Sequence, residues 1–183
     1  FIETTSECNL SCSYCPRPRI SRELPFELFT KIVDEASIYG HRSFSLHLFG
    51  EPLLYSRIIE SIRYIKEIRH AVILTTNVVL LERYASELKI CDKIIWSYKK
   101  NLKVPDELKR WKNFTVRFFE GEEDKTWPKR EVRPYHNYGG TVFGVPSTDV
   151  QRYPCYHLWL APGVRTNGDI VICCADPEGK SVV

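Results

Sequence analysis

Methionine is absent from the 183 residues, the initiator included. We therefore expect the chain to be a truncated part of a longer gene product. Long apolar runs are lacking as well, because none approaches the roughly 20 residues that a membrane-spanning helix needs. The amino end also shows no signal-peptide pattern. Together these absences predict a protein without a membrane partner.

An excess of charge of one sign is also missing. The chain has 26 Lys and Arg against 23 Asp and Glu, and its net charge of +3 is compatible with an anionic partner without arguing for one. No additional basic or OB-like module is evident, so we do not expect nucleic acid as a partner. With 43% hydrophobic and 27% charged residues, the composition is that of an ordinary globular protein with a buried core.

Cysteine, in contrast, is plentiful: the chain has seven, and they are clustered. Without a secretion signal, such clusters indicate metal or redox chemistry in a reducing compartment, so we expect a cytoplasmic protein. Cys8, Cys12 and Cys15 form the pattern C-x3-C-x2-C, one thiolate short of the four that complete a structural zinc site or a [4Fe–4S] cube. Zinc is the alternative metal, but no histidine lies within the first forty residues to complete its site.

This spacing, with Tyr14 directly before the third cysteine, resembles the radical S-adenosylmethionine (SAM) superfamily. The resemblance implies a [4Fe–4S] cluster on Cys8, Cys12 and Cys15, whose remaining iron binds the amino and carboxylate groups of SAM. It also implies that the backbone around Tyr14 lies against the adenine of SAM.

Gly50, Glu51 and Pro52 resemble the second signature of the superfamily, whose backbone and carboxylate hold the amino group of SAM. Physically, glycine permits a close backbone approach, glutamate answers an ammonium group, and proline makes the turn rigid. Asn77 ends a Thr-Thr-Asn sequence that resembles the Thr-Asn-Gly of the superfamily, with Val78 in place of the glycine. Asn77 is therefore expected to contact SAM or substrate, the alternative being a plain turn-forming asparagine.

The order of expected elements indicates an α/β fold. Hydrophobic periodicity predicts strands over residues 1–5, 43–49, 71–76, 93–97 and 114–119, and helices over residues 25–39, from residue 56 onward and over residues 81–90. The alternation favours parallel strands, which need a crossover to return, and their continuous apolar character favours cover on both faces. We expect residues 1–137 to form a partial parallel (β/α)6-type barrel, in which residues 120–134 are a solvated loop.

Chemistry in such folds lies at the carboxyl ends of the strands. The cysteine loop, the Gly-Glu-Pro turn, Asn77 and Ser97 all follow predicted strands. By the same resemblance Ser97 lies near the SAM ribose, or it caps the following segment instead. His136 and Tyr138 are our candidates for the mouth of the substrate site. His47 is either a core histidine or a substrate contact inside the barrel.

Residues 138–183 predict a second region. Asn167 and Gly168 between β-prone runs are typical of a hairpin turn. Cys155, Gly168 and Cys173 follow C-x12-G-x4-C, which resembles the start of a SPASM or twitch extension and implies Cys155 and Cys173 as ligands of an auxiliary iron–sulfur cluster. The further cysteines of such extensions are missing, so this region looks truncated. Cys174 is expected to be a buried thiol.

The resemblance implies a radical SAM enzyme that cleaves SAM reductively to a 5′-deoxyadenosyl radical, which abstracts a hydrogen atom from a substrate carbon. Compact SPASM and twitch enzymes include aminocyclitol dehydrogenases and peptide maturases, so the expected substrate is a sugar-like or aminocyclitol-like small molecule or a peptide side chain. A reductant such as flavodoxin or ferredoxin is the expected protein partner. The alternative function is a non-catalytic iron–sulfur protein, for electron transfer or as a scaffold.

Overall fold

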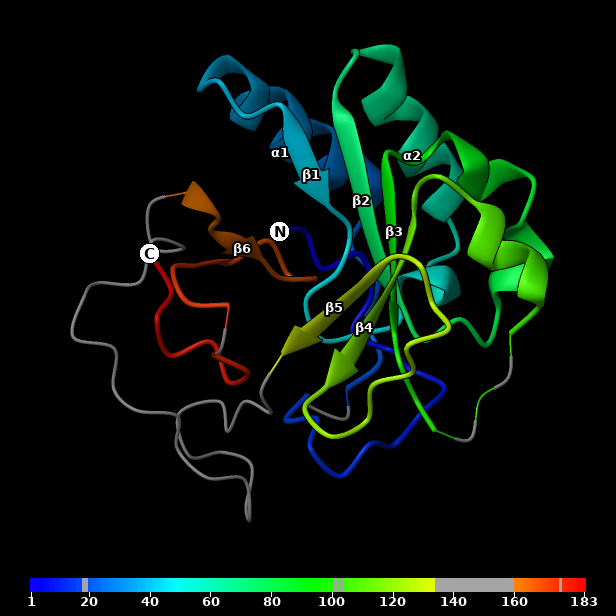
Figure 1. Cartoon of the computed structure of the whole chain (residues 1–183). Coiled ribbons are helices and arrows are strands. Elements are labelled where there is room, and N and C mark those ends of the chain that lie inside the picture. The colour runs from blue at the N-terminus through cyan, green and yellow to red at the C-terminus, as the bar shows by residue number, and fades with distance from the viewer. Residues whose placement is uncertain (18–19, 101, 103, 134–159, 175) are drawn as a thin grey trace.

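The computed structural model describes residues 1–17, 20–100, 102, 104–133, 160–174 and 176–183. Five parallel strands form one sheet in sequence order (Figure 1), which confirms the α/β fold. These strands are β1 (Ser43–Ser45), β2 (Ala71–Thr76), β3 (Lys93–Ser97), β4 (Phe114–Phe119) and β5 (Arg130–Arg133). The predicted bounds of β2, β3 and β4 agree with the structure.

Two α-helices lie on the same side of this sheet (Figure 1), namely α1 (Phe26–Ile38) and α2 (Ile58–Glu67). Both agree with the expected helices to within a turn. Short 3-10 helices make further connections: η1 (Pro52–Leu54), η2 (Leu81–Tyr84), η3 (Glu87–Ile90) and η4 (Asp106–Arg110). None of the helices in the described part of the chain could cross a membrane.

Burial alternates along the strands. In β2, Val72 and Leu74 are buried whereas Ile73 and Thr75 are half-buried, and β4 shows the same alternation. The buried strand positions join one hydrophobic cluster with Phe29 of α1, and α2 and the 3-10 helices also contribute their buried apolar side chains to it. Among the described residues, the helices pack on one face of the sheet. In β3, Ile94, Ile95 and Trp96 are buried in succession, so this strand is covered on both of its faces.

The amino-terminal segment replaces the first expected strand with isolated backbone contacts. Ile2 N–H donates to the Ser45 carbonyl at 2.8 Å, and Glu3 N–H donates to the Val164 carbonyl at 2.8 Å. Leu24 N–H donates to the Thr4 carbonyl at 2.9 Å, so the residues just before α1 also bond to this segment. The segment thus links β1 to the carboxyl-terminal hairpin without forming a regular strand.

The strand expected over residues 43–49 ends at Ser45, because the chain must bend to bring Gly50 against the amino-terminal segment. A Cβ atom at Gly50 would lie 1.8 Å from the Thr5 carbonyl oxygen, so only glycine fits this approach. The helix expected over residues 81–90 is also wrong, since η2 and η3 are two separate 3-10 helices. Leu81 and Leu88 nevertheless enter the core.

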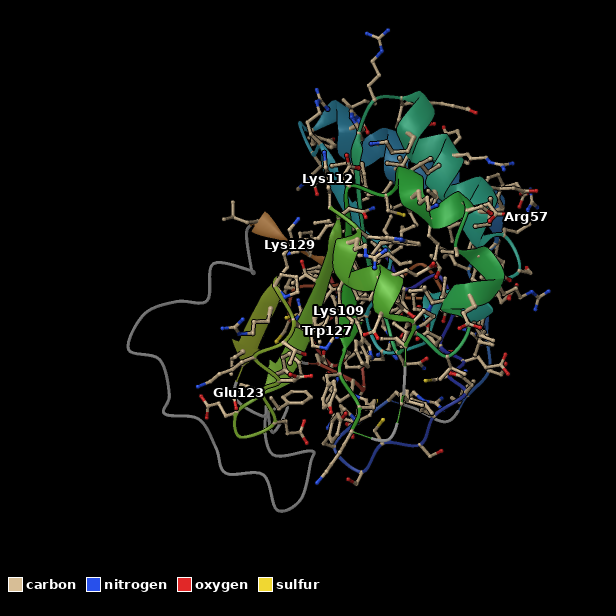
Figure 2. All side chains as sticks on the ribbon, turned by 45° about the vertical axis from the view of Figure 1, so that its right-hand side comes forward. Arg57, Lys109, Lys112, Glu123, Trp127 and Lys129 are labelled. Atoms are coloured by element: carbon tan, nitrogen blue, oxygen red, sulfur yellow. The ribbon has the colours of Figure 1, made fainter. Side chains whose placement is uncertain are left out.

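The loop expected over residues 120–134 contains β5, which pairs in parallel with β4. It was missed because β5 is a charged strand at the edge of the sheet with three of its four side chains exposed, so it has no apolar alternation. Trp127, just before β5, is buried edge-on against Trp96 at a centroid distance of 5.4 Å. Lys109 of η4 covers the Trp127 ring with its Nζ atom 5.3 Å from the ring centroid (Figure 2).

The carboxyl-terminal hairpin is confirmed. Strands β6 (Gly163–Val164) and β7 (Ile170–Val171) pair antiparallel, and Gly168 in the turn has a φ of +91°, which favours glycine. The boundary between residues 1–137 and 138–183 remains a prediction, because residues 134–159 lie outside the described residues.

Candidate active site

The cysteine loop follows the amino-terminal segment at the carboxyl edge of the sheet. Cys8, Cys12 and Cys15 are free thiols and half-buried. Cys15 N–H donates to the Cys12 carbonyl at 3.1 Å, which closes a turn and keeps these two residues close. Leu10 N–H donates to Cys8 Sγ at 3.5 Å, so the first sulfur already has an amide donor. Burial raises the pKa of the Cys8 thiol.

Arg17 stabilises the cysteine loop by hydrogen bonds to its backbone. Its guanidinium donates to the Ser6 carbonyl at 3.2 Å, to the Cys8 carbonyl at 3.2 Å and to the Leu10 carbonyl at 3.5 Å. One cation therefore ties together three backbone groups around the first cysteine. The sequence alone gave no signal for this role, because Arg17 lies in a Pro-Arg-Pro-Arg run that looks like an exposed loop.

Glu51 connects the Gly-Glu-Pro turn to the end of β2. Its side chain is 2% exposed and accepts hydrogen bonds from Thr76 Oγ1 at 2.7 Å, Asn77 N–H at 2.7 Å and Leu53 N–H at 3.2 Å. Burial raises the pKa of this carboxyl group, and the three donors oppose that rise. Glu51 thus fixes the turn against β2, while its expected contact with the SAM amino group remains a prediction.

Asn77 brings β2 to the cysteine loop. Its Nδ2 atom donates to Asn9 Oδ1 at 2.7 Å and lies 3.7 Å from Cys8 Sγ. Its Oδ1 atom accepts a hydrogen bond from Val79 N–H at 3.0 Å, which is the turn-forming role of an asparagine. Val78 has a φ of +64°, so the position where the superfamily has glycine keeps a left-handed backbone.

Lys99 connects the cysteine loop to the end of β3. Its Nζ atom lies 4.8 Å from the Tyr14 ring centroid and donates to Ser97 Oγ at 3.4 Å. Tyr14 also contacts Phe119 of β4 edge-on, at 5.2 Å between centroids. Burial lowers the pKa of Lys99, and the thiols of the cysteine loop oppose this shift. The structure therefore brings Tyr14 and Ser97 together through a lysine that sequence analysis missed.

The remaining predicted residues divide into two groups. Cys173 is half-buried and follows β7, and Cys174, expected to be buried, is half-buried too. Cys155, His136 and Tyr138 lie outside the described residues, so the auxiliary cluster and the substrate mouth remain predictions. Cys91 is buried in the core.

The three cysteines of the loop are the kind of ligand that an iron–sulfur cluster needs. Among the described residues, no three Cys, His, Asp or Glu side chains form a group suited to one metal ion. In a [4Fe–4S] cube each thiolate binds a different iron, so the ligands stand farther apart than around one ion. Half-buried free thiols, an amide donor to the Cys8 sulfur and a loop bonded to Arg17 are compatible with such a cluster.

A partial parallel barrel with a three-cysteine loop at its carboxyl edge defines an α/β protein of the iron–sulfur type. The family model described as the radical SAM superfamily matches residues 2–111, and the chain belongs to this superfamily. Its members use a [4Fe–4S] cluster and SAM. The residues gathered at this edge fit both.

Curated relatives match part of the chain. A protein named probable GTP 3',8-cyclase from Methanococcus maripaludis strain S2 is 38% identical over 93 residues, 48% of this chain and 31% of the relative. The GTP 3',8-cyclase of Desulforamulus reducens is 35% identical over 96 residues, again 48% of this chain and 29% of the relative. The match thus spans less than a third of these relatives.

Two solved structures share the fold. The structure of BtrN in complex with AdoMet and 2-DOIA has a TM-score of 0.73 at 20% identity and covers 99% of this chain and 74% of BtrN. The structure of Streptococcus suis SuiB bound to the precursor peptide SuiA has a TM-score of 0.76 at 14% identity, covering 95% of this chain and 58% of SuiB. At these identities the likeness shows the fold alone.

Proposed function

We propose that the chain is the SAM-binding part of a radical SAM enzyme, with Cys8, Cys12 and Cys15 as ligands of the [4Fe–4S] cluster. A cluster bound there would supply the electron for reductive cleavage of SAM to methionine and a 5′-deoxyadenosyl radical, and that radical would take a hydrogen atom from a substrate carbon. The observation that carries this proposal is the bonded path from Cys8 through Asn77 to Glu51. A simple electron carrier has no need to join its cysteine loop to a Gly-Glu-Pro turn.

The chain's own residues would bind SAM and hold it in a fixed orientation. In this proposal the backbone at Tyr14, Gly50 and Pro52, together with Asn77 and Ser97, forms the SAM site. Glu51 holds the Asn77 backbone in place, and the packed aromatic rings of Tyr14 and Phe119 shield that side of the loop. Shielding matters because the radical reacts with any hydrogen donor it meets.

The substrate is proposed to be a small molecule. The relatives named GTP 3',8-cyclase match only the part shared with the superfamily, and the related structures contain 2-DOIA in one case and a peptide in the other. Neither comparison therefore selects one substrate. Oxidation or modification of a sugar-like or aminocyclitol-like molecule fits the compact barrel, with a peptide side chain as the alternative.

Residues 138–183 are proposed to begin an auxiliary-cluster region with Cys155 and Cys173 as ligands. The confirmed hairpin turn at Gly168 supports the expected C-x12-G-x4-C geometry on the side of Cys173. A small electron-transfer protein, flavodoxin or ferredoxin, is the proposed reductant, since radical SAM enzymes need an external electron.

The test is anaerobic reconstitution with iron and sulfide, followed by dithionite and SAM. We expect the reconstituted protein to contain enough iron for at least one [4Fe–4S] cluster per chain and to form 5′-deoxyadenosine. Cys12→Ala should lose the cluster of the cysteine loop and all SAM cleavage, whereas Cys91→Ala, which changes a thiol buried in the core, should keep both. A filled cluster that forms no 5′-deoxyadenosine would support the electron-transfer alternative.

A further inference from the structure

The face of the sheet opposite α1 and α2 carries polar side chains at successive strands. Alternation along β2, β3 and β4 places Thr75, Ser97 and Arg117 on this inner face, because Leu74, Trp96 and Phe118 beside them are buried in the core on the helical side. Glu131 of β5 lies on the same face, since it is opposite Arg117 in the strand register and is ion-paired with it. Ser97 pairs with Arg117 in the strand register, and Arg117 pairs with Glu131. These three residues thus form one row across β3, β4 and β5, starting beside Lys99 of the candidate active site.

One carboxylate in this row meets three cations. Glu131 accepts from Lys93 Nζ at 2.5 Å and from Arg117 Nε at 3.2 Å, and an Arg133 guanidinium nitrogen lies 3.7 Å away. Burial opposes ionisation of Glu131, but the Lys93 hydrogen bond and the Arg117 charge outweigh it and lower its pKa. The group therefore holds three positive charges against one negative charge.

Neutral polar atoms complete this inner face. The Nδ1 atom of His47 and the Oγ1 atom of Thr75 are buried and have no hydrogen-bond partner among the described residues. Burial and the charges of Arg117 and Arg133 lower the pKa of His47 to about 3, so its imidazole is neutral.

Two buried polar atoms, His47 Nδ1 and Thr75 Oγ1, have no hydrogen-bond partner among the described residues, and the charge of Arg117 acts on His47. The side chains of Arg117 and Glu131 are 18% and 24% exposed, so water screens their charges incompletely, whereas those of Lys93 and Arg133 are 40% and 58% exposed. An oxyanion on this face would accept hydrogen bonds from the cations and from the Thr75 hydroxyl group.

We propose that the inner face binds a phosphate or carboxylate group of a small-molecule substrate, with Arg117 and Arg133 as its charge partners and His47 and Thr75 as neutral hydrogen-bond partners. This rests on the proposed function in that the substrate carbon must lie near SAM. The row from Arg117 to Ser97 leads to that edge of the sheet. In this proposal the protein selects its substrate by a phosphate or carboxylate group that binds to the inner face while the reacting carbon lies near SAM.

The test measures anion binding by calorimetry to the reconstituted protein at low ionic strength. The probes are inorganic pyrophosphate, succinate and a tetraglutamate peptide, so that phosphate, carboxylate and peptide sources are separated. We expect pyrophosphate or succinate to bind, and Arg117→Gln to weaken that binding about tenfold or more, because a charged hydrogen bond is lost. Arg63→Gln, the same change on the exposed face of α2, should stay within about twofold.

Two further variants keep the test decisive if Arg117→Gln does not fold. Arg117→Gln with Glu131→Gln removes the pair together, and Thr75→Val removes a hydroxyl that no described residue bonds. Both should weaken binding. The proposal is overturned if neither small anion binds, if only the peptide binds, or if these variants bind like the parent protein. Iron content and SAM cleavage of the parent protein report separately on the proposed function.

Discussion

Glu51 accepts the backbone N–H of Asn77 at 2.7 Å, although the two residues are 26 positions apart in the chain. This bond joins the turn after β1 to the end of β2, directly beside the cysteine loop. Replacing a buried carboxylate that accepts three hydrogen bonds lowers stability, because each donor left unpaired in the interior has lost its hydration without gaining a partner. Glu51 is therefore a structural element of the site as well as the charged residue of the Gly-Glu-Pro turn.

Glu51→Gln is expected to lower the free energy of unfolding by about 2 kcal/mol. In either orientation of the new amide, its NH2 group faces a backbone donor, either Asn77 N–H or Leu53 N–H. Urea denaturation measures the change. Glu67→Gln, on the exposed side of α2, should change stability by less than about 0.5 kcal/mol. Equal effects of the two substitutions would contradict this role for Glu51.

The sequence was most informative where burial is one-sided or complete. The strands β2, β3 and β4 have apolar residues whose period agrees with their place in the sheet, and the predicted bounds were right. The strand β5 was missed because at the edge of a sheet few side chains need to be apolar. Pairing with β4 decides its conformation, and that partner is invisible to local periodicity.

The site was predictable as a set of motifs but not as a network. The cysteine spacing and the Gly-Glu-Pro turn could be found because their chemistry needs fixed residue types. Arg17 and Lys99 could not, since each acts through distances to backbone carbonyls or aromatic rings that only the fold sets. The inner-face pairing of Arg117 with Glu131 likewise depends on the register of an unpredicted strand.

Val78 offers a test of backbone strain. It is 6% exposed and has a φ of +64°, where a β-branched side chain is strained by about 1–2 kcal/mol. Val78→Ala and Val78→Gly lose the same kind of packing, but only glycine relieves the strain. We expect the glycine variant to be more stable than the alanine variant by about 1 kcal/mol in urea denaturation.

The matched control for this comparison is Val72, which is buried in the extended backbone of β2. There the usual order should hold, and Val72→Gly should be less stable than Val72→Ala by about 1 kcal/mol. If glycine is also the worse substitution at position 78, the left-handed backbone is not a source of strain.

Glu3 predicts a pH dependence of stability. Its side chain is 1% exposed, its Oε1 atom has no hydrogen-bond partner among the described residues, and burial raises its pKa. The pKa of Glu3 is higher in the folded protein than its unfolded value of about 4.3, so the protonated form of Glu3 favours folding. This contribution to the free energy of unfolding is fully present below about pH 4.3. It is lost as pH rises through the folded pKa.

Glu3→Gln removes this titration. The stability of the variant relative to the parent protein should therefore rise with pH from about pH 4 and level off above the folded pKa of Glu3. Unfolding by urea at a series of pH values measures it. Glu27→Gln, in the first turn of α1 and outside this buried environment, serves as the control and should show no such rise. A difference that falls with pH would mean that Glu3 is stabilised as the anion.

Lys99 predicts a shift in the reduction potential of the reconstituted cluster. Its ammonium group acts electrostatically on Cys12, Cys15 and Cys8, and it is held over Tyr14. A nearby positive charge favours the reduced cluster, which carries one more electron, so Lys99→Met should lower the midpoint potential by on the order of tens of millivolts. Lys99→Arg should restore it.

The measurement is a redox titration followed by electron paramagnetic resonance, with iron content determined on the same samples. Lys100→Met removes an equal charge from the neighbouring exposed position, so its potential should stay close to that of the parent protein. An equal shift in both variants would mean that the overall charge of the protein sets the potential. A shift confined to Lys99→Met, at unchanged iron content, assigns the effect to the charge of Lys99, which acts on all three thiols.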